Sequence, residues 1–323
     1  MESANRSVVK MFVILAFPAS PQLRMLAFTL ILLTYILTIT SNMVIISVIK
    51  ANRKLQRPMY YFLGNFSFME IWYTTSTVPK MLESFLGSGS PITVAGCIAQ
   101  LYLFFALGST ECFLLATMAY DRFLAICHPL HYPALMNLQT TTWLVTGAWV
   151  GGFLAPLLPI VLISQLSFCG PKVIHHFFCD AGPLLRRSCD NALLSSTMVS
   201  VLASLVILST CLLTMISYTF IISTILHIPS ATGRRKAFST CASHLAVVVI
   251  YYATVIFIYV RPISPSSSEL DKVASFFYAV VTPLLNPMIY SLRNKEVKEA
   301  LKMMVGNRQM FVKNTRTLSM DCL

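Results

Sequence analysis

The chain has 323 residues, of which 56% are hydrophobic and only 11% are charged, and its 24 Lys and Arg outnumber its 12 Asp and Glu. So few charged residues exclude a soluble domain, in which about 25% is usual. Disorder, a collagen-like repeat and a small disulfide-stapled domain are also excluded, because apolar residues are abundant, Gly numbers 12 and nine Cys are spread over a long chain. An all-α membrane protein remains.

Seven apolar segments are each long enough to cross a bilayer as a helix, which takes roughly 20 residues. Their apolar runs are continuous and lack the two-residue period of barrel strands, so helices are expected. The predicted spans are Met25–Ile49, Pro58–Phe85, Cys97–Cys127, Thr140–Ile163, Thr197–Leu226, Ala237–Tyr259 and Lys272–Leu292. The sequence therefore predicts a seven-helix membrane bundle over residues 25–292, between an N-terminal tail, 1–24, and a C-terminal tail, 293–323, that carries a short amphipathic helix.

The distribution of positive charge predicts how the bundle is oriented, because cytoplasmic loops carry an excess of Lys and Arg. Most of the 24 basic residues follow the first span, end the third, precede the sixth or follow the seventh. These ends are expected in the cytoplasm, so the N terminus and the long loop 164–196 are extracellular and the C terminus is cytoplasmic. The net charge of +12 is explained in the same way, and nucleic acid is not an expected partner.

The N-terminal tail has two features that bear on export. Its apolar stretch 8–19 is interrupted by Pro18 and lacks a small-residue cleavage site, which favours an uncleaved tail over a signal peptide. Asn5-Arg6-Ser7 is an N-glycosylation sequon, and the predicted topology places it outside the cytoplasm.

Two acidic residues, Glu70 and Glu111, lie in the middle of the second and third spans. An isolated charge there costs about 3 kcal/mol or more, so both are interpreted as functional residues. Two neighbouring carboxyls cannot both ionise cheaply, which leaves a shared proton or a bound sodium ion as alternatives. A protonated hydrogen bond between helices explains them as well as a switch does. They also motivate the rival function, a transporter or a proton or cation channel.

An adjacent acid and base, Asp121 and Arg122, lie at the predicted cytoplasmic end of the third span. The two can pair while the bundle is closed, and opening would free Arg122 for a partner protein. An isolated Asp-Arg dipeptide is more simply explained as an interfacial arginine that reaches toward water. The residues on both sides of this pair decide between the two explanations.

The segment from Met118 to Tyr132, MAYDRFLAICHPLHY, resembles the hallmark of odorant receptors, the largest branch of the rhodopsin-like G-protein-coupled receptors. Further matches follow in the family's order, and they are PMYYFL from Pro58, PKML from Pro79, KAFSTCASHL from Lys236 and PLLNPMIYSLRN from Pro283. The resemblance covers nearly the whole chain. The chain departs from the family pattern at four positions. Ser41, before Asn42, and Ala253, after Tyr252, stand where the family usually has Gly, Glu70 stands for the usual Asp, and Phe123 stands for the usual Tyr.

The resemblance implies a receptor, not an enzyme, that lies in the plasma membrane among lipids. It implies a small-molecule odorant as ligand and a heterotrimeric stimulatory G protein, which raises cAMP, as partner. The implied activation switch comprises Asp121, Arg122, Tyr218, His244, Asn286, Pro287 and Tyr290. The implied buried polar network comprises Asn42, Glu70 and Glu111. Pro283 and Pro287 are expected to break the seventh helix.

Four cysteines lie at the predicted extracellular face, namely Cys97, Cys169, Cys179 and Cys189. Four cysteines allow three pairings, so their spacing alone leaves the choice open. The resemblance implies Cys97 with Cys179 and Cys169 with Cys189. A metal site is the alternative, with the ligands His175, His176, Cys179 and Asp180. It is disfavoured because the spacing matches no standard zinc pattern, and no cofactor is otherwise expected.

The resemblance also implies a ligand pocket between the outer halves of spans three, five, six and seven. Counting helical turns back from Arg122 predicts one inward stripe, formed by Phe104, Phe105, Gly108, Ser109 and Cys112. Tyr252 and Tyr278 are expected to face this stripe. Phe104 stands eighteen residues before Arg122, where amine receptors of the superfamily carry an Asp, so a cationic amine is disfavoured. A small neutral molecule held by one or two hydrogen bonds is expected.

Overall fold

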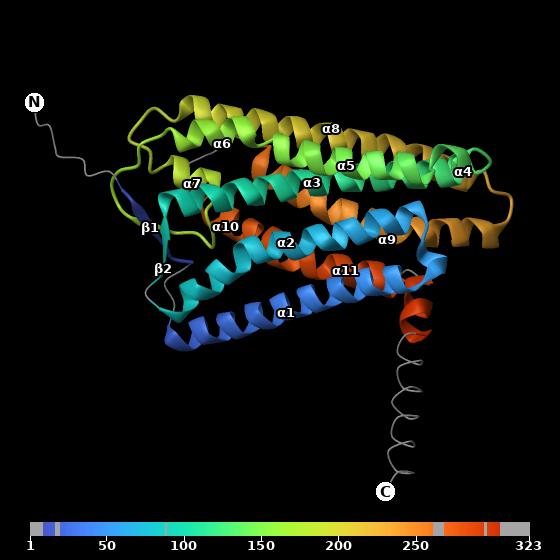
Figure 1. Cartoon of the computed structure of the whole chain (residues 1–323), viewed down its shortest axis with the longest axis horizontal. Coiled ribbons are helices and arrows are strands. Elements are labelled where there is room, and N and C mark those ends of the chain that lie inside the picture. The colour runs from blue at the N-terminus through green and yellow to red at the C-terminus, as the bar shows by residue number, and fades with distance from the viewer. Residues whose placement is uncertain (1–8, 17–19, 88, 261–267, 294–295, 304–323) are drawn as a thin grey trace, which may run out of the picture.

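The computed structural model describes residues 9–16, 20–87, 89–260, 268–293 and 296–303. Its long helices run side by side along the longest axis of the molecule (Figure 1). They are α1 (Pro21–Ala51), α2 (Pro58–Leu86), α3 (Val94–Cys127), α5 (Leu138–Leu154), α8 (Leu193–Leu226), α9 (Ala231–Tyr259) and α11 (Thr282–Arg293). The shorter helices are α4 (Tyr132–Leu135), α6 (Leu157–Ser164), α7 (Ala181–Leu185) and α10 (Ser268–Phe276), with a 3-10 turn at Arg53–Leu55 and a helix over 296–303.

The starts of the long helices follow from local sequence. Thr93, Asn137 and Ser230 precede α3, α5 and α9, and each side-chain oxygen accepts a hydrogen bond from a backbone N–H of the first turn. Proline occupies the first turn of α1 and α2, where its missing N–H costs nothing. The prediction of a predominantly helical protein is therefore confirmed.

Prolines interrupt two of the predicted spans. The span Thr140–Ile163 is divided into α5 and α6 at Ala155 and Pro156. The span Lys272–Leu292 runs through α10, a π-helical turn at Phe277–Val281 and α11. This turn lies directly before Pro283, whose ring would collide with the carbonyl four residues back in a regular helix. Pro287, by contrast, lies inside α11.

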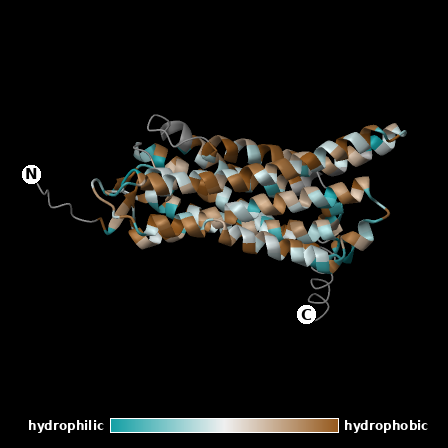
Figure 2. Ribbon diagram, turned by 90° about the horizontal axis from the view of Figure 1, so that it is seen from above, coloured by the Kyte–Doolittle hydropathy of each residue, from teal (hydrophilic) through white to brown (hydrophobic). Residues whose placement is uncertain are grey.

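The outside of the bundle is apolar. Figure 2 shows hydrophobic residues along the helices and hydrophilic residues gathered toward the two ends. Within the described residues, five helical segments are long and apolar enough to cross a membrane, and α9 is a sixth if its two parts, bent by 47°, count as one span. The helix α2 has the length, but Glu70 and its many tyrosines and threonines lower its mean hydropathy. The chain is thus a multi-pass membrane protein. Hydropathy alone does not identify α2 as a span, so its assignment as one of the seven predicted spans rests on its packing between α1 and α3.

The central element is α3, which packs against α2, α5, α6, α8 and α9. In the most apolar 18-residue stretch of α3, 61% is buried, whereas in that of α8 only 22% is buried. Most of α3 therefore faces other parts of the protein, and most of α8 faces outward. Its buried residues recur at helical spacing from Cys97 through Phe104 and Leu115 to Asp121. One helix therefore connects both ends of the molecule through its interior.

A small sheet beside the start of α3 departs from the all-α prediction. The strand β1 (Met11–Ile14) pairs antiparallel with β2 (Ser90–Thr93) and parallel with β3 (Val173–Ile174). Its side chains alternate, so that Phe12 and Ile14 are fully buried, and the Phe12 ring packs edge-on against Phe168 with centroids 5.7 Å apart. Part of the predicted N-terminal tail is therefore a structural strand, whose partners come from two distant loops.

We predict that Gly152→Ala destabilises the bundle by about 1–3 kcal/mol, the usual cost of an overpacked core. A Cβ on Gly152 would lie 2.0 Å from Thr110 Oγ1 and 2.7 Å from the Thr110 backbone nitrogen, so α5 and α3 would have to separate. Gly147→Ala on the same helix is the control, because nothing lies within 4 Å of its added Cβ. Thermal unfolding of the purified variants measures both, and equal melting temperatures would contradict the close-contact role of Gly152.

Candidate functional site

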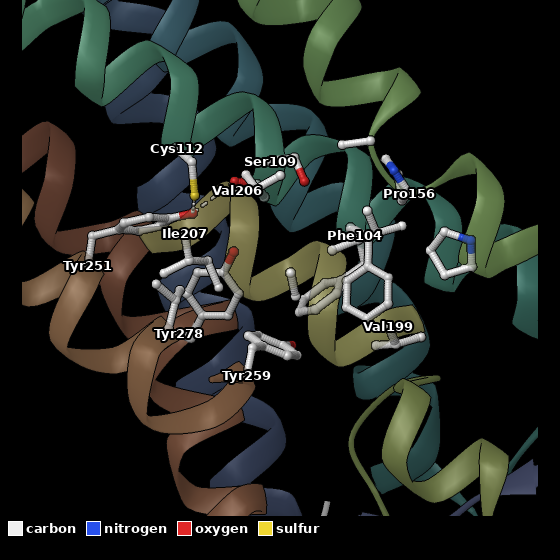
Figure 3. Close-up of a pocket in the computed structure, with 17 residues that line it drawn as sticks. Phe104, Ser109, Cys112, Pro156, Val199, Val206, Ile207, Tyr251, Tyr259 and Tyr278 are labelled. Carbon is white, nitrogen blue, oxygen red and sulfur yellow. Dashed lines mark hydrogen bonds between the residues drawn. The ribbon is translucent and has the colours of Figure 1, made fainter. Parts of the chain in front are cut away.

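A cavity lies between α3, the α5–α6 junction, α8, α9 and the π-helical turn (Figure 3). It contains about 570 Å³ of empty space, its mouth included. Every member of the stripe predicted on α3 lines it, and Tyr278 lines the opposite wall. These residues are Phe104, Phe105, Gly108, Ser109, Cys112 and Tyr278. The structure therefore brings the α3 stripe and the seventh predicted span together at one cavity.

The remaining walls of the cavity are mostly apolar. They comprise Ala155, Pro156, Pro159, Val199, Leu202, Ala203, Val206, Ile207, Tyr251, Val255 and Tyr259. No charged side chain is among the described lining residues, and the polar groups are the hydroxyls of Ser109 and three tyrosines and the Cys112 thiol. Such a cavity suits a small neutral molecule with one or two hydrogen-bonding groups.

Tyr251, not the predicted Tyr252, faces the cavity. The Tyr251 hydroxyl donates to the Gly108 carbonyl at 2.8 Å and lies 3.2 Å from Cys112 Sγ, as Figure 3 shows. The Tyr252 hydroxyl instead lies 3.5 Å from the Cys112 carbonyl. Neighbouring residues on a helix point about 100° apart, so an error of one position changes the face.

Tyr259 is a lining residue that the sequence reasoning missed. It lies on the same side of α9 as Tyr251 and Val255, at successive four-residue steps, so the correct register of α9 would have found it. Its hydroxyl is buried and has no hydrogen-bond partner among the described residues. Within the described part of the chain, this hydroxyl is therefore a polar group at the wall of the cavity that a ligand could engage.

Gly108 is a point of close contact between helices as well as a lining residue. A Cβ built on Gly108 would lie 2.6 Å from the Tyr278 hydroxyl. The absence of a side chain thus lets Tyr278 reach α3. A bulky residue at this position would displace Tyr278 as well as narrow the cavity.

The long loop between α6 and α8, here called the covering loop, packs on α3 beside the cavity and is fastened to that helix. Its Phe178 ring packs on Phe104 with centroids 4.6 Å apart. Cys179 forms a disulfide with Cys97, and its backbone N–H donates to Gln100 Oε1 at 3.0 Å. A second disulfide, Cys169 to Cys189, closes the loop on itself. Both pairs are those implied by the resemblance.

The metal alternative at this loop finds no support in the geometry. Cys179 is occupied in the disulfide, so its thiolate cannot be a metal ligand. In the part of the chain that the structure describes, no three His, Cys, Asp or Glu side chains gather as a metal site would require. His176 and Asp180 instead form hydrogen bonds with backbone groups of the loop.

His176 and Asp180 are two buried titratable groups of the covering loop. His176 Nδ1–H donates to the Phe178 carbonyl at 3.0 Å, and Nε2 has no partner among the described residues. Burial lowers the pKa of His176 to about 4, although the bond to Phe178 opposes the shift. Asp180 accepts a hydrogen bond from the Ala181 N–H at 2.8 Å, and burial raises the pKa of Asp180 to about 6.

The two buried acids meet Asn286 deeper in the bundle. Glu70 is fully buried and Glu111 is 2% exposed, and the two carboxyls are close enough to interact electrostatically. The Asn286 side-chain amide donates to Glu70 Oε1. Asn42 is also buried, but its amide donates to the Thr38 carbonyl within α1. The structure therefore brings together α2, α3 and α11 at these polar groups, and gives Asn42 a partner on its own helix.

Asp121 and Arg122 are paired at the other end of α3. Arg122 Nη2 and Nε lie 3.1 and 3.2 Å from Asp121 Oδ2, and the Tyr132 hydroxyl donates to Asp121 Oδ1 at 2.8 Å. The Asp121 side chain is fully buried, and the Arg122 side chain is 15% exposed. In this arrangement the arginine is held by its own neighbour.

Two of the other predicted switch residues, Tyr218 and His244, lie near this pair, whereas Asn286 contacts Glu70 deeper in the bundle. The Tyr218 hydroxyl is 2.7 Å from His244 Nδ1, and both side chains interact electrostatically with Arg122. Tyr290 lies on α11, but its side chain is outside the described residues, as is the predicted glycosylation site Asn5.

Comparison with known proteins gives consistent matches. The family model described as "Olfactory receptor" matches residues 31–308. The chain is 50% identical to Olfactory receptor 6F1 of Homo sapiens, over 93% of this chain and 98% of that protein. It is 51% identical to Olfactory receptor 6A2 of Homo sapiens, over 93% of this chain and 94% of that protein. It is also 50% identical to Olfactory receptor 226 of Rattus norvegicus, over 94% of each of the two chains.

We predict that the covering loop contains two opposing pH responses. His176 is neutral when folded, so stability is lost as the pH falls from its unfolded pKa near 6.5 to about 4. Asp180 is protonated more easily when folded, so stability is gained as the pH falls from about 6 toward its unfolded value near 3.8. Each contributes about 2 kcal/mol between pH 7 and 4.5 by linkage.

Single variants separate the two responses. Asp180→Asn keeps a side-chain oxygen for the Ala181 N–H and should lose stability relative to the unchanged chain as the pH falls from 7 to 4.5. His176→Gln should gain stability relative to it over the same range. Thermal unfolding at a series of pH values measures both, and three parallel curves would refute the assignment.

Proposed function

The chain belongs to the olfactory receptor family of G-protein-coupled receptors, and from that premise we propose that it binds small, mostly apolar odorant molecules in the cavity beside α3. Binding activates a stimulatory G protein at the plasma membrane and raises cAMP. The observation that carries this proposal is the cavity beside α3, in which no described lining residue is charged and whose Phe104 packs against the disulfide-fastened loop. Burial of apolar ligand surface in it contributes about 25 cal/mol per Å², and one hydroxyl adds selectivity.

The proposed topology has seven spans with the N terminus outside and the C terminus inside. The basic residues around the 3-10 turn Arg53–Leu55 and at the start of α9 support a cytoplasmic position for these ends. The disulfides and the small sheet then lie at the extracellular face, where disulfides persist. Asn5 lies on the same side and is the proposed glycosylation site.

The proposed switch is the release of Arg122. In this structure Asp121 binds Arg122, and Tyr132 holds Asp121 in place. Opening the cytoplasmic end breaks this pair and presents the guanidinium to the G protein. Tyr218, His244, Asn286, Pro287 and Tyr290 are the proposed residues that rearrange with it.

The buried acids are proposed to share a proton or to hold a sodium ion. Glu70 Oε2 and Glu111 Oε1 are buried and have no hydrogen-bond partner among the described residues. Either a proton or a cation between them would reduce the energy of burying two carboxylates that repel each other. Family membership favours this role over the ion path of a transporter or channel. Asn286, on α11, lets the acids respond to movement of the seventh helix.

We predict that Ser109→Ala lowers agonist potency about fivefold. The Ser109 hydroxyl lines the cavity, and a net hydrogen bond to the ligand is worth about 1 kcal/mol. Concentration–response curves of cAMP, taken with several agonists found in a chemically diverse odorant panel, measure the change. Thr117→Val is the control, because it removes a hydroxyl from α3 outside the cavity. Equal potencies for all three chains would place the ligand elsewhere.

We predict that Arg122→Ala abolishes agonist-dependent cAMP while the receptor still reaches the cell surface. The guanidinium is the group that the open state offers to the G protein, and alanine removes its charge. Surface labelling and direct stimulation of adenylyl cyclase control for delivery and for cell competence. Undiminished agonist responses in this variant would defeat the coupling proposal.

A further inference from the structure

A second hollow lies at the opposite end of the bundle from the covering loop. It is a groove along α2, between α1 on one side and the segment of α4 and α5 on the other, which we call the α2 groove. Its lining residues are Ile46, Ile49, Lys50, Leu55, Gln56, Arg57, Pro58, Tyr60, Tyr61, Gly64, Asn65, Phe68, Met136, Leu138 and Thr141. None of them belongs to the odorant cavity, and none is used in the proposed switch.

The floor of the α2 groove is empty because of Gly64. A Cβ on Gly64 would meet only Ile49 Cδ1, at 4.0 Å, so no described side chain packs closely over this part of α2. The groove contains about 1340 Å³ of space, its open side included. At its deep end Trp149 from α5 donates to Asn65 Oδ1 at 3.3 Å, and its ring lies 6.0 Å from that of Phe68. The groove is therefore open along the bundle and closed at depth.

The two ends of the α2 groove differ in charge. Ile46, Ile49 and Phe68 make its deep part apolar, whereas Lys50 and Arg57 bring positive charge to its rim. No acidic residue is among the described lining residues. Outside the lining, Glu296 pairs with Arg57, with Oε1 lying 3.5 Å from Arg57 Nη1 and both side chains at least half exposed. An exposed pair of this kind leaves Arg57 able to bind a second anion.

We propose that the α2 groove binds an anionic glycerophospholipid of the cytoplasmic leaflet. Its phosphate lies between Lys50 and Arg57, and one acyl chain runs over Gly64 toward Phe68. A chain and a charged head match the two ends of the groove, and cytoplasmic leaflets carry the anionic lipids. A sterol would fill the apolar part but would leave two cations facing a neutral hydroxyl. The choice of leaflet rests on the orientation given under Proposed function.

Native mass spectrometry of the full-length chain in detergent tests the proposal. The probes are palmitoyl-oleoyl phosphatidylserine and phosphatidylcholine, which share the same acyl chains. The unchanged chain should retain phosphatidylserine at least fivefold better. Lys50→Gln and Arg57→Gln should each reduce that preference threefold or more. Arg53→Gln and Lys54→Gln remove the same charge from the same loop outside the groove and should leave the preference intact.

Two further variants test the groove and its rim separately. Gly64→Leu fills the floor, so both phospholipids should be lost although every charge remains. Glu296→Gln frees Arg57 of its pair, so phosphatidylserine should be retained at least as well as by the unchanged chain. Unfolding temperatures of all variants show whether each is folded.

Three results would overturn the proposal. They are equal retention of the two phospholipids by the unchanged chain, an equal effect of Arg53→Gln and Lys50→Gln, and retained cholesterol that displaces phosphatidylserine and ignores Lys50→Gln. The measurement uses neither odorant nor G protein. Failure of the lipid site therefore leaves the receptor proposal standing, and failure of odorant signalling leaves the lipid result interpretable.

Discussion

The contact of Asn286 with the buried pair Glu70 and Glu111 is the interaction on which the rest of the structure depends. A bilayer offers no water to an ionised carboxyl, so such a group must find its partners inside the protein. Here the partners come from three helices, α2, α3 and α11. Asn286 of α11 reaches them beyond a π-helical turn that ends just before Pro283. The positions of three helices are thus tied to one polar contact in an apolar bundle.

From this contact α3 runs in both directions. Toward the covering loop, Ser109 and Gly108 lie within one helical turn of Glu111. Beyond them, Phe104 packs against Phe178, and Cys97 is bonded to Cys179. Toward the other end lies the Asp121–Arg122 pair. Cys112, which lines the cavity, directly follows Glu111. A ligand in the cavity therefore presses on the same stretch of helix that holds the acids, which gives the proposed receptor a physical route from ligand to switch.

Much of this arrangement could be predicted from the sequence, because membrane helices carry strong local signals. Apolar length gave the helices, proline gave the interruption of the seventh predicted span near Pro283, and helical spacing gave the stripe on α3 that meets the cavity. Pro287 was also expected to break that helix but lies inside α11, and the break at Pro156 was not predicted. The strand β1 could not be predicted, since four residues with partners in two distant loops carry no local signal. Tyr252 was assigned for Tyr251 because α9 has apolar or aromatic residues on every face, which leaves its rotation undetermined by pattern. The burial of His176 depends on the folded loop and has no sequence signature.

The most direct test of the account is a double-mutant cycle on Glu70→Gln and Glu111→Gln, read as agonist potency in the cAMP response at matched surface expression. If the two acids and Asn286 act as one unit, the first substitution already removes the shared proton or cation. The double variant should then be no worse than the more damaging single variant, with a coupling of about 1 kcal/mol or more, a fivefold departure from additivity. Effects that simply add would show that the acids act separately and would contradict the central claim.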